Sequence, residues 1–412
     1  MLYTQDPILA DMISREAKRQ DEEIELIASE NYVSKAVLEA NGSILTNKYA
    51  EWYPGKRYYG WCSVIDEVEQ LAIDRAKELF WAEHANVQPL SWSPANMAVF
   101  MALLQPGDTV LGFSLDQWGH LSHGHPMNFS GILYNIIPYH LNRETEEMDM
   151  DELERLALEH KPKLIIAWFS AYSRSLDWKR FREIADKVWA YLLADIAHIA
   201  GLIAAKLIEN PVPYCDAVTS TTHKTLRWPR WGLILCKKKY AKVIDRMVFP
   251  GLQWGPHENL IAWKAVAFWE ALKPEFVEYQ KQVMKNAQTL AMELENLWVK
   301  VVSGWTSNHL MLIDVYKSFW VTGKDAEKYL EEVGLSCNKN MVPYDTRPPM
   351  NPSWIRLWTP AATTRGMKES EMKTIAKIIV LTLTSEGNIE TLHSLRWDVL
   401  ELCKKFPIYS TQ

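Results

Sequence analysis

The chain has 412 residues, of which 48% are hydrophobic, and this length favours two domains with separate cores. A net charge of −6 at pH 7 argues against the basic surfaces that bind nucleic acid or anionic membranes. No run approaches the roughly 18 apolar residues that a membrane span needs, and the N-terminal residues lack the apolar core of a signal peptide. Five cysteines show no metal-ligand spacing, so we expect reduced thiols, a cytoplasmic location and no metal site.

The predicted elements alternate between helices and strands. Residues 8–25 have apolar spacing near 3.6 and predict an N-terminal helix. Apolar runs predict buried strands at 109–115, 163–169, 190–195, 216–219 and 232–236. Amphipathic helices are expected at 151–160 and 178–189. This alternation, with strands that are apolar throughout, predicts a mainly parallel sheet covered on both faces.

The pattern changes from about residue 285. A helix comes first, and strands follow around 308–315. Helices are then expected at 322–333 and 367–383. Together these elements predict a smaller α+β domain at the C-terminal end.

Lys224 and Asp195 form the most informative pair in the sequence. Lys224 lies in the hydroxyl-rich run Thr-Ser-Thr-Thr-His-Lys-Thr at 219–225, and Asp195 ends the apolar run at 190–195. A lysine so placed can form a Schiff base with the aldehyde of pyridoxal phosphate (PLP), and an aspartate can keep the pyridine nitrogen protonated. Taken singly, the lysine is also typical of a solvated loop and the aspartate of a helix cap.

Several longer motifs accompany this pair. They are Leu-Ile-Ala-Ser-Glu-Asn (26–31), Leu-Thr-Asn-Lys-Tyr-Ala-Glu (45–51), Tyr-Pro-Gly-Lys-Arg-Tyr-Tyr-Gly (53–60), Ala-Asn-Val-Gln-Pro (85–89), Asp-Ile-Ala-His-Ile-Ala-Gly-Leu (195–202), Thr-Thr-His-Lys-Thr-Leu-Arg (221–227) and Thr-Pro-Ala-Ala-Thr-Thr-Arg-Gly (359–366). In this order and spacing, from about residue 5 to 405, the chain resembles the serine hydroxymethyltransferase family.

The resemblance implies a PLP-dependent transferase of fold type I. Its large domain would hold a mainly parallel seven-stranded sheet, and its C-terminal domain would be smaller and α+β. The implied reaction moves the hydroxymethyl group of serine reversibly to tetrahydrofolate, which gives glycine and 5,10-methylenetetrahydrofolate. We expect a homodimer with shared active sites, built from an N-terminal arm and dimer-contact segment (1–60), a PLP-binding domain (61–284) and a small domain (285–412).

The resemblance also assigns roles to individual residues. Catalytic roles fall to Lys224, Glu51, His223 and Asp195. Cofactor contacts are assigned to Ser91, Trp92, Ser93, His120, Ser170, Asp195, His198, Lys224, Arg230, Tyr49 and Gly255. Contacts to the amino acid or to folate are assigned to Ser29, Tyr59, Arg356, Leu115, Gly119, Leu121 and Asn340.

Physical chemistry supports some of these assignments. Ser91 and Ser93 flank the expected start of a helix, where backbone amides and the helix dipole favour a phosphate. Arg356 has a guanidinium fork that matches both oxygens of a carboxylate. Glu51 is a carboxyl group able to carry the proton that leaves the serine hydroxyl. By resemblance, His120 would stack on the face of the cofactor ring.

Tryptophan is unusually frequent and glycine unusually rare. The sequence has 19 Trp and 17 Gly, whereas average usage gives roughly 29 Gly in a chain of this length. Compared with the family pattern, fifteen tryptophans stand at glycine positions: 52, 61, 81, 92, 118, 168, 189, 228, 231, 254, 298, 305, 320, 354 and 358. Trp92 replaces the glycine of a Ser-Gly-Ser turn, so we expect its indole to lie beside the phosphate. We expect the fold of the family with an activity that the tryptophans weaken or abolish.

Two other functions are compatible with parts of this pattern. Another fold-type I PLP enzyme, such as a threonine aldolase, would share the lysine and the aspartate. A dimeric scaffold that does not hold PLP is favoured by Trp92 and Trp254, both of which stand at the expected phosphate contacts. Dependence of serine cleavage on tetrahydrofolate would separate the first alternative, and a lack of PLP binding would support the second.

Overall fold

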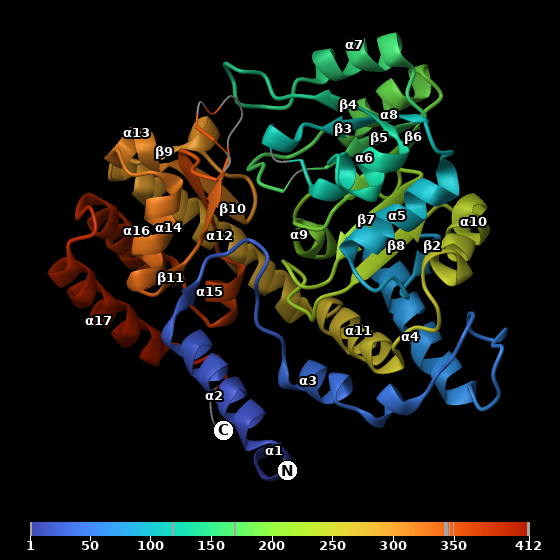
Figure 1. The fold of residues 1–412 in the computed structure, drawn as a ribbon, viewed down its shortest axis with the longest axis horizontal. Coiled ribbons are helices and arrows are strands. Elements are labelled where there is room, and N and C mark those ends of the chain that lie inside the picture. Colours follow the sequence, from blue (N-terminus) through green and yellow to red (C-terminus); the bar gives the residue numbers. More distant parts are fainter. Residues whose placement is uncertain are drawn as a thin grey trace. The chain divides into compact units, whose positions relative to one another are not determined.

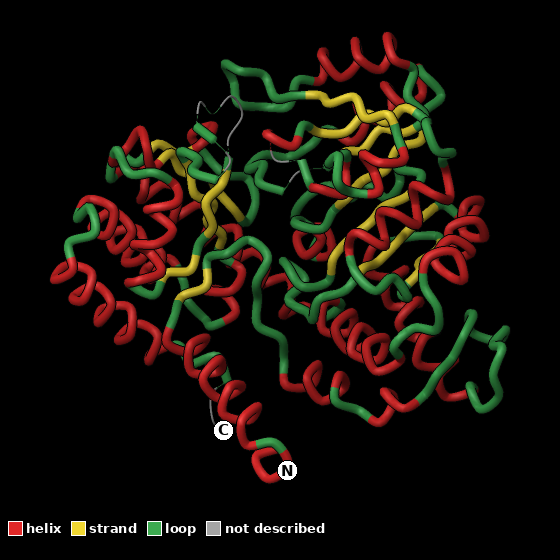
Figure 2. Tube along the Cα trace, viewed as in Figure 1, coloured by secondary structure: helices red, strands yellow, loops and turns green. Residues whose placement is uncertain are grey.

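The computed structural model describes residues 2–117, 119–168, 170–341, 345, 347–348 and 350–409. Its internal contacts divide the chain into a large unit, Val33–Lys281, and a small unit, Met1–Tyr32 with Gln282–Gln412. Figure 1 labels the elements along the chain, and Figure 2 separates helices from strands. The domain boundaries at residues 60 and 284 remain predictions. Among the described helices, none combines the length and the apolar character needed to cross a membrane.

The large unit is built on a seven-stranded sheet, as predicted. In spatial order its strands are β2 (His84–Asn86), β8 (Gly232–Cys236), β7 (Ala217–Thr221), β6 (Tyr191–Asp195), β5 (Leu164–Ala167), β3 (Thr109–Phe113) and β4 (Asn135–Tyr139). β8 runs antiparallel to both of its neighbours, and the other pairs are parallel. Every residue of β5, β7 and β8 is buried, which shows that helices and loops cover both faces of the sheet.

Helices connect and cover these strands. The longer ones are α4 (Ser63–Phe80), α5 (Trp92–Leu103), α7 (Met150–His160), α8 (Trp178–Lys187), α11 (Glu258–Ala271) and α12 (Pro274–Asn296), which continues into the small unit. Shorter ones are α3 (Lys35–Asn41), α6 (Phe129–Leu133), α9 (Ala200–Ala204), α10 (Ala241–Arg246), and the single turns η1 (Ile44–Asn47), η2 (Leu115–Gln117), η3 (Leu121–His123), η4 (Lys238–Tyr240) and η5 (Met247–Leu252). α5 packs against β7 and β8 through an apolar core that includes Val99, Ala217 and Ile234.

The predicted elements of the large unit agree with the structure apart from their ends. Helices α7 and α8 begin where Asp149 and Asp177 accept hydrogen bonds from the backbone amides three residues on. The strand expected at 109–115 ends at Phe113, because Leu115 already belongs to the short turn η2. The strand at 232–236 has the predicted bounds.

The small unit is an α+β structure. A four-stranded antiparallel sheet has the order β12 (Asn338–Asn340), β13 (Trp354–Trp358), β10 (Leu310–Asp314) and β9 (Lys300–Val301). A separate pair joins β1 (Ile24–Glu25) in parallel to β11 (Leu335–Ser336). The helices are α1 (Leu2–Gln5), α2 (Pro7–Glu22), α13 (Val315–Phe319), α14 (Gly323–Glu332), α15 (Pro360–Thr364), α16 (Glu369–Thr384), α17 (Ile389–Lys405) and the turn η6 (Val302–Gly304). The helix expected at 8–25 is shorter than predicted, because Ile24 and Glu25 pair with β11 instead.

Candidate active site

Asp195 is the centre of a buried polar cluster in the large unit. It is the last residue of β6 and is 2% exposed. Its Oδ2 accepts hydrogen bonds from Asn96 Nδ2 at 2.9 Å and from the indole Nε1 of Trp92, and it lies 3.1 Å from Nε2 of His123. Its Oδ1 accepts from the backbone amide of Ala197 at 3.1 Å. Both oxygens of this carboxylate are therefore held in fixed positions.

Asn96 and His123 also belong to this cluster, although no sequence motif indicates them. Asn96 lies on α5, where it also accepts a hydrogen bond from Thr219 Oγ1 at 2.6 Å and donates to Ser122 Oγ at 2.9 Å. His123 ends the turn η3 and is 1% exposed. The one signal in the sequence is that His123 follows His120 by three residues, and this spacing alone does not indicate a contact with Asp195.

Trp92 is the first residue of α5, and its indole lies inside the cluster. The ring stacks on the imidazole of His120, with centroids 3.6 Å apart and planes inclined by 28°. Nζ of Lys224 lies 3.9 Å from the centre of the indole. The indole is thus held between a histidine and a lysine, with its N–H directed at Asp195. The resemblance predicts a phosphate beside this indole, and in the structure the ring lies against Asp195, His120 and Lys224.

A second indole, that of Trp168, borders the same space. Trp168 follows β5 and is 1% exposed. Its ring centroid is 5.3 Å from that of Trp92, 4.6 Å from His123 and 6.2 Å from His198. Among the described residues, its buried Nε1 has no hydrogen-bond partner. His198, in the loop after β6, is buried, and Ser170 lies half-buried after the end of β5.

Lys224 follows β7, and its surroundings favour neutral histidines. Lys224 itself is buried. Burial, with the charges of His123 and Lys224, lowers the pKa of His120 to about 2. Burial and the charges of Lys224 and Arg230 lower the pKa of the neighbouring His223 to about 3. Both imidazoles are therefore neutral at ordinary pH. The Arg230 side chain is exposed.

Two of the expected phosphate contacts, Ser91 and Ser93, lie at the start of α5, and a third, Gly255, lies in the loop before α11. Ser91 precedes the helix with an extended backbone, and its carbonyl accepts the amide of Ala95 at 3.1 Å. Ser93 lies in the first turn. Gly255 packs closely against Tyr49, whose ring carbon would lie 3.2 Å from a Cβ at that glycine. The structure thus brings Tyr49 and Gly255 together.

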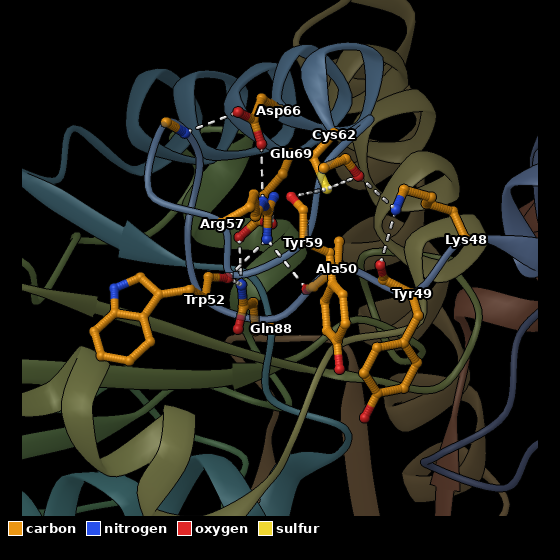
Figure 3. Close-up of polar contacts among 12 residues, drawn as sticks. Lys48, Tyr49, Ala50, Trp52, Arg57, Tyr59, Cys62, Asp66, Glu69 and Gln88 are labelled. Atoms are coloured by element: carbon orange, nitrogen blue, oxygen red, sulfur yellow. Dashed lines mark hydrogen bonds and ion pairs between the residues drawn. The ribbon is translucent and has the colours of Figure 1, made fainter.

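The segment that contains Tyr49, Glu51 and Tyr59 is anchored by a buried arginine (Figure 3). The Arg57 side chain is 3% exposed and forms ion pairs with Glu69 at 2.6 Å and with Asp66 at 2.8 Å. Around this anchor the rings of Tyr49 and Tyr59 meet edge to face at 5.9 Å, and both are exposed. Glu51 is buried, and its charge raises the pKa of the Tyr59 hydroxyl.

Three expected folate contacts lie between β3 and α6. Leu115 is in η2, and Leu121 begins η3 with an exposed side chain. Gly119 lies so close to the backbone at the end of β3 that a Cβ there would be 2.2 Å from the carbonyl oxygen of Phe113. Trp118, one of the fifteen tryptophans expected at glycine positions, lies outside the described residues.

The remaining expected contacts belong to the small unit. Arg356 lies on β13, and its Nε donates to Asn338 Oδ1 at 3.2 Å. Burial lowers the pKa of this guanidinium to about 10. Because side chains alternate along a strand, Trp354 and Trp358 flank Arg356 on the same face. The other two residues are Asn340, on β12, and Ser29, in the turn after β1.

The sequence profile of the serine hydroxymethyltransferase family matches residues 2–379. This chain belongs to the serine hydroxymethyltransferase family. A curated serine hydroxymethyltransferase of Mycoplasma mycoides subsp. mycoides SC is 57% identical over 403 residues, which make up 98% of this chain and 97% of that protein. Members of the family are PLP-dependent glycine hydroxymethyltransferases of fold type I, and they use tetrahydrofolate as co-substrate. The predicted family, fold class, function, enzyme class and cofactor are thereby confirmed.

The residues around Asp195 fit PLP only in part. An acid, a flat imidazole and a lysine amine stand around one ring-sized space, which suits a pyridine ring with a protonated nitrogen. That space holds the indole of Trp92, which already makes contacts with Asp195, His120 and Lys224. With the indole in this position, the cofactor ring does not fit between the three residues.

Proposed function

We propose that this chain transfers the hydroxymethyl group of serine to tetrahydrofolate and forms glycine, with the groups around Asp195 as the centre of the site. The observation that carries the proposal is the arrangement of Asp195, His120 and Lys224 around one flat ring. Bound PLP would supply an electron sink to the amino-acid substrate. Asp195, His120 and Lys224 are the residues proposed to hold it, together with Ser91, Ser93, Ser170, His198, Arg230, Tyr49 and Gly255. His223, beside Lys224, is proposed as a catalytic residue.

Arg356 is proposed to bind the carboxylate of the amino acid. Its guanidinium offers two parallel donors, and its pKa of about 10 still leaves it charged at neutral pH. Ser29 is proposed as a second contact to this carboxylate. Leu115, Gly119, Leu121 and Asn340 are the proposed folate contacts.

A homodimer is proposed to share its sites through Tyr49, Glu51 and Tyr59. The two tyrosine rings are exposed, which supports a role at the surface of a neighbouring subunit. Glu51 is the proposed proton carrier when the hydroxymethyl group leaves serine, because a carboxyl group can accept the hydroxyl proton. A cytoplasmic location without nucleic-acid or membrane partners completes the proposal.

Tryptophans are proposed to stand at positions where the family has glycine. Six of them support this, because their backbones have the left-handed φ that favours glycine. They are Trp52 (φ 78°), Trp61 (61°), Trp81 (52°), Trp189 (58°), Trp298 (65°) and Trp320 (59°). Glycine adopts this region without a steric penalty, whereas a residue with a Cβ costs roughly 1–2 kcal/mol there.

The test is an assay of glycine formation from serine, with and without tetrahydrofolate. It is run on the unmodified protein and on a Trp92→Gly variant, each with excess PLP. We expect tetrahydrofolate-dependent turnover in both proteins, higher in the variant, and loss of that turnover when Lys224→Ala is added. Serine cleavage that does not depend on tetrahydrofolate would instead indicate an aldolase. No turnover by a variant that binds PLP would contradict the proposed function.

A further inference from the structure

The indole of Trp92 contacts Asp195, His120 and Lys224 at the same time. We propose that Trp92 is an internal plug, whose side chain takes the place of the cofactor ring and competes with PLP for Asp195, His120 and Lys224. The inference rests on the proposed function, because it assumes that PLP binds at these residues. It adds that the unmodified chain binds its cofactor only in those molecules whose indole has rotated out of the site.

The contacts of the indole reproduce those that a pyridine ring needs. One face stacks on His120 at a centroid distance of 3.6 Å, which is close contact between aromatic planes. Lys224 Nζ is 3.9 Å from the ring centre, so the only amine expected to react with PLP faces the indole instead. The indole N–H donates to Asp195 Oδ2, as a protonated pyridine nitrogen would.

The walls of the site hold the indole in place. Trp168 lies against Trp92 with a centroid distance of 5.3 Å, and the ring of His123 meets it edge-on at 6.5 Å. Trp92 is also the first residue of α5, whose first turn is fixed by the bond from Ala95 N to the Ser91 carbonyl. The backbone therefore cannot retreat without loosening the helix, and PLP can enter only if the side chain rotates out.

The size of the effect follows from the population of the open state. An apparent dissociation constant rises in inverse proportion to the fraction of molecules that can bind. If the indole is out in about 1% of molecules, PLP binds about 100-fold more weakly than to an open site. The Trp92→Gly variant removes the ring and the competition together.

The experiment is a PLP titration of four proteins, read as the visible absorption that remains after gel filtration. They are the unmodified chain, Trp92→Gly, Trp92→Phe and the control Trp189→Gly, which removes an exposed indole from another part of the large unit. We expect Trp92→Gly to bind PLP more tightly than the unmodified chain and the control, by about 100-fold for an open population of about 1%. Trp92→Phe keeps an aromatic ring without the N–H, so its affinity for PLP should lie between those of Trp92→Gly and the unmodified chain.

Free indole provides an independent readout that requires no catalysis. Indole should bind to Trp92→Gly and displace PLP from it, because it restores the ring and the N–H that face Asp195. Equal PLP affinity of the unmodified chain and Trp92→Gly would overturn the proposal, as would a folded Trp92→Gly variant that binds no PLP. If Trp92→Gly does not fold, stoichiometric PLP binding by the unmodified chain overturns it and weak binding relieved in Trp92→Phe supports it. If Trp92→Gly binds PLP but does not turn over serine, the proposal about Trp92 still stands and only the proposed function is contradicted.

Discussion

Trp189 offers a direct test of backbone strain, because its indole is almost fully exposed and contributes little packing. It lies between α8 and β6 with φ of 58°, and its side chain is 93% exposed. A Cβ in this left-handed region costs roughly 1–2 kcal/mol, which glycine avoids. Replacing Trp189 with glycine therefore removes the strain at little cost in packing.

The useful comparison is Trp189→Gly against Trp189→Ala, since both remove the indole and only alanine keeps the Cβ. Relief of strain favours glycine by roughly 1–2 kcal/mol, and the greater freedom of glycine in the unfolded chain opposes it by about 0.4–1 kcal/mol. The net expectation is that the glycine variant is more stable by up to about 1.6 kcal/mol, with a midpoint near 0.8 kcal/mol.

Denaturation in guanidinium chloride, followed by circular dichroism, measures this difference. The matched control is the same pair of substitutions at Trp269, a half-exposed residue within the helix α11. There the sign reverses, because glycine in a helix is less favourable than alanine by about 0.8–1.0 kcal/mol. A Trp189→Gly variant that is less stable than Trp189→Ala, as expected at Trp269, would refute the strain argument.

Two further predictions concern buried charges of the large unit. Burial and the nearby Glu69 raise the pKa of Glu258 to about 8, so the stability that its bound proton confers is lost as the pH rises through that value. Relative to Glu258→Gln, the free energy of unfolding of the unmodified protein should fall by about 1.4 kcal/mol for each pH unit that the pH rises between about pH 5 and 8. Parallel curves of denaturation midpoint against pH for the two proteins would contradict this prediction. Arg57→Met should lower the free energy of unfolding by about 3–5 kcal/mol, because it leaves the Glu69 carboxylate buried without its cation. The double variant Arg57→Met with Glu69→Leu should recover most of that loss in the same denaturation measurement.

Much of the sheet could be predicted because its strands are short apolar runs between polar turns. The run that ends at Asp195 is β6, and the run before Lys224 is β7, and these strands are parallel neighbours. Since the carboxyl ends of parallel strands meet at one edge, the two residues were predictable as a pair. The end of α2 was not, because the pairing of Ile24 with β11 depends on residues more than three hundred positions away.

The contents of the site were harder to predict than its position. Asn96 and His123 reach Asp195 from a helix and a turn, and neither belongs to a motif that indicates this contact. The direction of the Trp92 side chain is set by the stacking surface of His120 and the acceptor on Asp195. Sequence order places Trp92 at the start of a helix, but only the folded arrangement shows which space its ring fills.

The most direct test of the central claim is a crystal structure of the unmodified protein grown with excess PLP. We predict density for the Trp92 indole between His120 and Lys224, with its N–H on Asp195 and no cofactor ring in that place. Density for PLP joined to Lys224, with the indole rotated away, would contradict the claim that Trp92 closes the site.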